Sequence, residues 1–168
     1  YIEIILSATQ FGVPQRRRRF FILASRFSNW KLSAPEPTHN KEITVAEAFA
    51  GLPNVIPNSN EEKTEYNGEE SDFSLLMKDS NFWKTESKAK LSYQKPMKHR
   101  EYTLKRFSLL NPGESLKNLF ERYVEEEREA LQKERILPKK MFIKRNYRLV
   151  SSEASPTVTS HCLDEFVH

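Results

Sequence analysis

Two segments near the N-terminus have the residue pattern of β-strands. Residues 1–6 and 18–24 are rich in β-branched and aromatic side chains, and the loop between them contains Gly12 and Pro14. Turn residues between two strand-like runs are typical of a hairpin. We therefore predict a β-hairpin-like unit at this end of the chain.

A short helix and an exposed connection are predicted next. Thr44 is a suitable N-cap for a helix over 45–52, which Pro53 and Pro57 would terminate. Residues 58–72 are rich in Asn, Glu, Ser and Gly and poor in apolar residues, so we expect an exposed connection there.

The second half of the chain predicts a loop-rich surface followed by a helix. Residues 73–107 lack clear periodicity and mix aromatic with basic side chains, which favours an irregular recognition surface. After a turn at 109–114, Ser115 is expected to cap one helix that runs to about Arg135. Residues 141–143 favour a strand. The helix predicted from Ser115 has apolar residues at roughly helical spacing, and we expect them to face inward. They are Leu116, Leu119, Phe120, Tyr123, Val124 and Leu131.

Charge is unevenly distributed along a chain whose formal net charge is +4. Residues 61–73 contain six acids and one lysine, whereas residues 78–106 contain nine Lys or Arg against three acids. Residues 139–148 contain five bases and no acid. Such segregation is expected when one surface meets phosphate and another meets water. A generic solvated face is the alternative interpretation of the basic stretches.

Four consecutive arginines at 16–19 change this picture most. They stand between the Gly/Pro turn and an apolar strand, and four adjacent guanidiniums repel one another and cannot all be buried unpaired. This favours an anionic partner, most simply phosphate. Along a strand, Gln15, Arg17 and Arg19 would point to one face, and Arg16 and Arg18 to the other. A solvated basic edge strand that prevents edge-to-edge pairing is the alternative.

The run Phe-Gly-Val-Pro-Gln-Arg-Arg-Arg-Arg at 11–19 resembles the Gln-x-Arg-x-Arg motif of C5-cytosine DNA methyltransferases. A second stretch, over a hundred residues later, is similar to a later motif of the same family. It consists of Arg148-Leu-Val, then Ser-Pro-Thr-Val-Thr at 155–159, then Phe-Val-His at 166–168. In that family the stretch between the motifs is the variable target-recognition region, which here spans about 32–147.

The resemblance implies an α+β chain with two parts. Residues 1–53 would be the C-terminal part of the catalytic domain, with the terminal β-hairpin of an α/β S-adenosylmethionine-dependent methyltransferase sheet. Residues 54–168 would form a small, mixed, loop-rich target-recognition domain that binds DNA, with the return motif at 148–168.

Two patterns of the family do not occur in this sequence. They are the Phe-x-Gly-x-Gly loop that holds S-adenosylmethionine and the Pro-Cys dipeptide that carries the nucleophile. Cys162 has no preceding proline and is interpreted as a packing residue, with His161 beside it not a catalytic partner. We therefore expect a fragment, inactive by itself, whose cofactor is bound by another part of the protein.

The resemblance also implies roles for individual residues. The family swings its target cytosine out of the helix, and Arg19 would stabilise the negative charge that develops on the O2/N3 side of the ring. Arg17 would orient the site or a flanking phosphate, and Gln15 would position the strand. We expect Arg16 and Arg18, on the opposite face, to form ion pairs or backbone contacts. The residues predicted to bind DNA are Arg16, Arg18, Lys98, Arg100, Lys105, Arg106, Lys144, Arg145 and Arg148; those of the structural return motif are Pro156, Thr157 and Thr159.

The predicted function of the intact protein is cytosine-5 methylation of double-stranded DNA, as in restriction-modification. Its expected partners are duplex DNA and the rest of the enzyme or a catalytic subunit. A single cysteine, the lack of zinc spacing and the lack of a long apolar run favour a cytoplasmic protein without metal or membrane span. Alternatives are a transfer-RNA cytosine-5 methyltransferase, a separate DNA-recognition subunit, and an inactive nucleic-acid-binding remnant.

Overall fold

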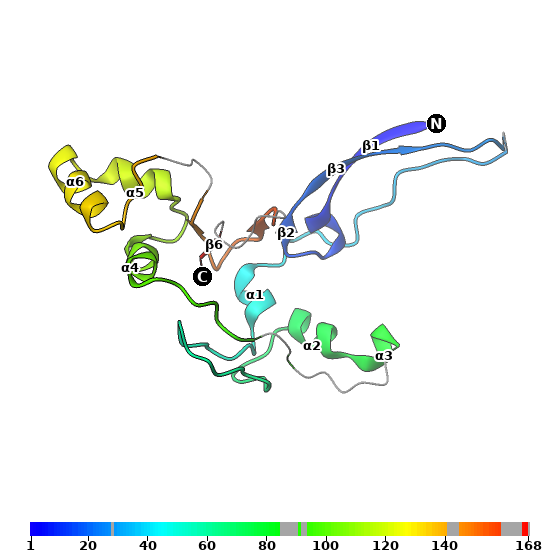
Figure 1. Ribbon diagram of the computed structural model, residues 1–168. Coiled ribbons are helices and arrows are strands. Elements are labelled where there is room, and N and C mark those ends of the chain that lie inside the picture. The colour runs from blue at the N-terminus through cyan, green and yellow to red at the C-terminus, as the bar shows by residue number, and fades with distance from the viewer. Residues whose placement is uncertain (28, 85–90, 92–93, 141–144, 159–165, 168) are drawn as a thin grey trace.

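The computed structural model describes residues 1–27, 29–84, 91, 94–140, 145–158 and 166–167. Within them the chain is mixed α and β, with three two-stranded sheets and six α-helices. Figure 1 shows a hairpin that projects from the centre of the molecule on one side and a group of helices on the other. This agrees with the α+β class expected from the sequence. No helix in the described residues is long and apolar enough to cross a membrane.

The projecting hairpin is the one predicted from the sequence. Strand β1 (Ile2–Ser7) pairs antiparallel with β3 (Arg18–Leu23), in a register that sets Ile2 opposite Leu23 and Ser7 opposite Arg18. A 3₁₀ turn, η1 (Ala8–Phe11), follows β1 and ends at Gly12, whose φ of 77° is left-handed. A residue without a Cβ adopts that conformation at least cost, which explains the glycine.

The two other sheets join segments that lie far apart in the sequence. Strand β2 (Gln15–Arg16) pairs parallel with β5 (Ser155–Pro156), and β4 (Tyr147–Arg148) pairs parallel with β6 (Phe166–Val167). The predicted strand at 141–143 lies outside the described residues.

Helix α1 (Val45–Phe49) begins at the predicted cap. The hydroxyl of Thr44 accepts the amide of Glu47 at 3.1 Å, and the Glu47 carboxylate accepts the amide of Thr44 at 2.8 Å. This reciprocal arrangement is a capping box. The helix ends three residues earlier than predicted, because Ala50 is extended and Gly51 is left-handed, with φ of 77°.

Three helices occupy the stretch that the sequence predicted to be loop-rich, so that expectation is wrong in part. They are α2 (Asp72–Lys78), α3 (Ser80–Trp83) and α4 (Glu101–Leu109). Caps explain the first two. The Ser71 hydroxyl accepts the amide of Ser74, and the Asp79 carboxylate accepts those of Asn81 and Phe82. A cap acts on single amides and needs no apolar periodicity.

The helix predicted from Ser115 to Arg135 is two helices, α5 (Leu116–Arg122) and α6 (Glu125–Lys133). Tyr123 and Val124 between them are extended, with ψ of 148° and 167°. The Glu127 carboxylate accepts the amide of Val124 at 3.1 Å and so begins a new helix inside the predicted one.

The helical region holds the core cluster of the described residues. Leu110, Leu116, Leu119 and Leu137 are buried, and Phe107, Leu109, Phe120, Tyr123 and Leu131 pack against them. The predicted stripe therefore faces inward, except at Val124, which is 64% exposed.

Candidate nucleic-acid interface

The two motif segments meet at the centre of the molecule (Figure 1). In the β2–β5 pair, Gln15 lies opposite Ser155 and Arg16 opposite Pro156. The Thr157 hydroxyl donates to the backbone carbonyl of Arg16 at 2.9 Å. The amide of Ser155 donates to the carbonyl of Pro14 at 3.0 Å. Thus the return motif is bonded directly to the arginine run.

Arg16 joins three segments. Its guanidinium contacts the carboxylates of Glu42 at 2.9 Å and Glu153 at 2.7 Å, and all three side chains are about half exposed. Hydrogen bonds to Glu42 first and to Glu153 second raise the pKa of Arg16 above its ordinary value. The ion pairs expected of Arg16 are confirmed, and two carboxylates offset its charge.

Of the remaining arginines of the run, Arg17 lies at a break between two strands, and Arg18 and Arg19 follow it. Arg17 belongs to neither strand, accepts the amide of Ala8 through its carbonyl at 2.9 Å and donates from its guanidinium to the Val158 carbonyl at 3.5 Å. Arg18 and Arg19 are exposed and begin β3. The guanidinium of Arg19 donates to the carbonyl of Arg18 at 2.7 Å.

This break alters the faces predicted from strict alternation. Gln15 is paired with β5, whereas Arg18 and Arg19 are paired with β1. The expectation that residues 15–19 form one strand with two simple faces is therefore wrong. Within β3, alternation still sets Arg18 and Arg19 on opposite faces.

The turn before the arginines is held by residues that the sequence analysis missed. The amides of Thr38 and His39 donate to the carbonyl of Gln10 at 3.0 and 3.1 Å, and the Thr38 hydroxyl lies 2.8 Å from His39 Nδ1. The His39 ring covers Gly12, where an added Cβ would lie 2.5 Å from Cε1. The left-handed glycine was the available signal, because it marks a tight turn, but the sequence does not reveal which segment covers it.

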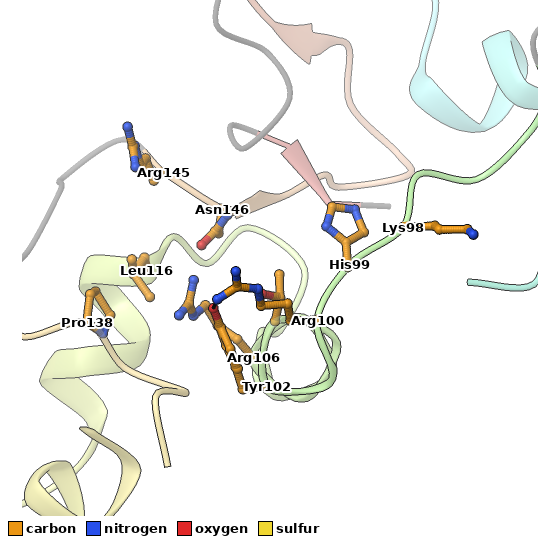
Figure 2. A pocket seen from close by; sticks show the side chains of 10 residues that line it. Lys98, His99, Arg100, Tyr102, Arg106, Leu116, Pro138, Arg145 and Asn146 are labelled. Atoms are coloured by element: carbon orange, nitrogen blue, oxygen red, sulfur yellow. Dashed lines mark hydrogen bonds between the residues drawn. The ribbon is translucent and has the colours of Figure 1, made fainter. Parts of the chain in front are cut away.

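A second group of basic residues surrounds an open cavity of about 370 Å³ beside the start of α4 (Figure 2). Arg100 Nη1 lies 3.2 Å from the Tyr102 hydroxyl, and Figure 2 shows both beside Arg106, with Lys98 and Arg145 toward the periphery. The cavity is lined by Lys98, His99, Arg100, Tyr102, Thr103, Arg106, Leu116, Pro138, Arg145 and Asn146.

Other predicted DNA-binding residues make contacts within the protein. Lys105 pairs with Glu134 at 2.8 Å, and the Arg148 guanidinium donates to the Leu110 carbonyl at 2.9 Å. Arg106 donates to the carbonyls of Arg135 and Ile136. The structure thus gathers Lys98, Arg100, Arg106 and Arg145 at one cavity and places Arg16–Arg19 elsewhere, at the hairpin. Lys144 and Thr159 lie outside the described residues.

Residues 2–159 match the family described as C-5 cytosine-specific DNA methylase. The chain belongs to this family. The resemblance found in the sequence is thereby confirmed. A relative, the Type II methyltransferase M.MthTI of Methanothermobacter thermautotrophicus, is 41% identical over 66 residues, which are 39% of this chain and 19% of that protein. The aligned part therefore covers about a fifth of the relative. No solved structure matches the chain.

Neither of the two basic cavities near α4 in this methylase-family chain suits S-adenosylmethionine. The sulfonium of that cofactor is positively charged, whereas the cavity at α4 is lined by cations and by no acid. A neighbouring cavity of about 690 Å³ has four basic residues and the one acid Glu129 in its wall; the basic residues are Arg106, Lys133, Arg135 and Lys139. Among the described residues, no three His, Cys, Asp or Glu side chains are grouped so that they could hold a metal ion.

Proposed function

We propose that this chain supplies the arginine strand and the target-recognition region of a DNA cytosine-5 methyltransferase of a restriction-modification system. The observation that carries the proposal is the direct bonding of the two motif segments through β2, β5 and the Thr157 hydroxyl. Family membership supports the reaction class. Duplex DNA is the proposed substrate, and the cytoplasm the proposed compartment.

The proposed division of the chain follows the same contacts. Residues 1–53 belong to the catalytic part and residues 54–168 to recognition, with a return segment at 148–168. The amides of Val45 and Ala46 donate to the carbonyls of Glu153 and Ser151 at 2.8 and 2.9 Å. The return segment thereby satisfies two amides in the first turn of α1, which supports its role in leading the chain back to the catalytic part.

In the proposed reaction, a cysteine thiolate from a part of the protein outside these 168 residues attacks C6 of a flipped cytosine. Negative charge then develops on the O2/N3 side of the ring, and a positioned guanidinium lowers the barrier by binding that charge. S-adenosylmethionine, bound elsewhere, would supply the methyl group to C5. Loss of the C5 proton then breaks the bond between C6 and sulfur and releases the thiolate. The chain alone is accordingly proposed to transfer no methyl group.

Arg19 is the residue proposed to stabilise this charge. Its side chain is exposed and donates a hydrogen bond to the carbonyl of the neighbouring Arg18. Arg16, held by Glu42 and Glu153, keeps β2 against β5 and is proposed as a positioning residue. Arg17 is proposed to orient the site or a flanking phosphate, and Gln15 to position the strand.

The test is Arg19→Ala in the complete enzyme. With saturating DNA, we expect the methylation rate to fall by about two orders of magnitude or more, with a modest change in DNA affinity, as for loss of a preorganised donor. Arg18→Ala, on the opposite face of β3, is the matched control and should leave the rate within a few-fold of wild type. Methylation at the wild-type rate by the Arg19 variant would refute its assigned role.

A further inference from the structure

The cavity beside α4 has the electrostatic character of an anion site. Five of the ten residues in its wall are basic or histidine, and none is acidic. Guanidinium and ammonium groups that gather in this way repel one another, and an anion between them relieves the repulsion. The five are Lys98, His99, Arg100, Arg106 and Arg145.

Arg100, Tyr102 and Arg106 form the centre of this wall. Arg100 Nη1 lies 3.2 Å from the Tyr102 hydroxyl, and Tyr102 and Arg106, four residues apart on α4, lie on the same face of the helix. Figure 2 shows the three side chains gathered together. Two guanidiniums and a hydroxyl are donors suited to the oxygens of a phosphate group.

The backbone that presents Arg100 is fixed in place. The Asn58 side chain, 41 residues earlier, donates to the carbonyl of His99 at 2.8 Å and accepts its amide at 2.6 Å. Arg106 donates to the carbonyls of Arg135 and Ile136, and Ile136 is buried. Donors that are held before a ligand arrives lose less conformational entropy when it binds.

The wall composition favours a phosphate of a polymer over a free small molecule. Pockets for small ligands are lined mainly by apolar and aromatic side chains, whereas this wall has only Leu116 and Pro138 as aliphatic members. Contacts to the DNA backbone come from Arg, Lys and Tyr side chains, which are the residue types found here.

We propose that the cavity formed by Arg100, Tyr102 and Arg106 binds one phosphate group of the DNA backbone. The site would fix the recognition region on the duplex without reading its sequence. This inference rests on the proposed function, because it takes duplex DNA as the ligand.

The experiment measures binding of the full chain to a fluorescent DNA duplex over a range of salt concentrations. Arg100→Gln should weaken binding about tenfold at low salt and flatten the plot of log affinity against log salt by about one unit. Arg26→Gln is the control, because it removes the same charge from the exposed end of the hairpin, away from the cavity. Arg100→Lys keeps the charge and should retain the wild-type slope.

The outcomes separate this proposal from the broader one. If Arg100→Gln and Arg26→Gln give the same slope while the wild type binds duplex, the cavity proposal is wrong and the methyltransferase proposal stands. If the wild type does not bind duplex at all, both are wrong. If Arg100→Gln fails to fold, a flattened slope for Arg100→Lys would overturn the assignment. Inorganic phosphate is also tested as a competitor, with chloride at the same ionic strength as the reference. The cavity would be assigned to free phosphate if phosphate displaced duplex more strongly than chloride while the slope for Arg100→Gln stayed at the wild-type value.

Discussion

The hairpin and the helical region differ in what holds them together. In the helical region, Leu119 is 0% exposed and belongs to a cluster of buried leucines on and around α5. In the hairpin, Phe20 is 57% exposed and Ile22 60% exposed, although the two strands pair over six residues each. Backbone hydrogen bonds hold the hairpin, whereas apolar burial holds the helices.

The proposed catalytic arginine therefore lies in the part of the molecule that buries the less apolar surface. A two-stranded hairpin is marginally stable by itself in water, since it buries little apolar surface. Arg19, the residue proposed to act on the base, nevertheless lies at the start of β3, and its position depends on contacts at one end of the hairpin, made by Arg16, Thr157 and the turn at Gly12. The basic cavity, in contrast, lies beside the helices that contain the cluster of buried leucines.

The largest effect is expected from opening the helical core. Leu119→Ala should lower the free energy of unfolding by about 2–5 kcal/mol, because it removes buried methyl groups and leaves a cavity. Phe20→Ala, in the hairpin, should cost under about 1 kcal/mol, because more than half of the ring is already exposed. Urea denaturation of both variants measures the difference. Equal losses would mean that the hairpin ring is as deeply packed as the leucine.

The sequence predicted elements whose signals are local. The hairpin and the capped helix at Thr44 follow from turn residues, β-branched runs and a capping residue, each within a few positions. The break between α5 and α6 was missed because it depends on one carboxylate, that of Glu127, whereas the apolar stripe continues across the break at Tyr123 and Val124. Helices α2 and α3 were missed because their caps act without periodicity.

The sequence predicted the members of the candidate site that belong to the two motifs, but not the residues that contact them. The two motifs identified Arg16 and Thr157, but the hydrogen bond between them was not predicted from the sequence. The carboxylates of Glu42 and Glu153 lie 26 and 137 residues from Arg16 in the chain, and pairing at that separation has no local signal. The same holds for the convergence of Arg100 with Pro138, Arg145 and Asn146 at one cavity.

A smaller effect is expected from the turn that carries the hairpin. Gly12→Ala should destabilise this region by about 1–2 kcal/mol, because φ is 77° and the new Cβ would lie 2.5 Å from His39 Cε1. Gly68→Ala is the matched control: its φ is 98°, and no atom lies within 4 Å of the added Cβ. Hydrogen exchange of the hairpin amides measures the effect. If Gly12→Ala in a His39→Ala background is no more stable than Gly12→Ala alone, the contact with His39 does not contribute.

The smallest effect concerns pH and the helical region. Burial raises the pKa of Glu114, but hydrogen bonds from Asn111 and the charge of Arg122 outweigh it, so the pKa lies below its ordinary 4.5. The ionised carboxylate therefore stabilises the fold above about pH 4.5, and this contribution is lost as the pH falls below that value. Glu114→Gln should lower the free energy of unfolding at pH 7 by under about 1 kcal/mol, since the pair with Arg122 is partly exposed. At about pH 3 the variant and the wild type should differ less.

The control is Glu134→Gln, which breaks a more exposed pair with Lys105 and should have a smaller effect at pH 7. Urea unfolding at both pH values measures the difference. An equal loss of unfolding free energy at both would show that the hydrogen bond from the Asn111 amide and the packing of Glu114, and not its charge, stabilise the turn before α5.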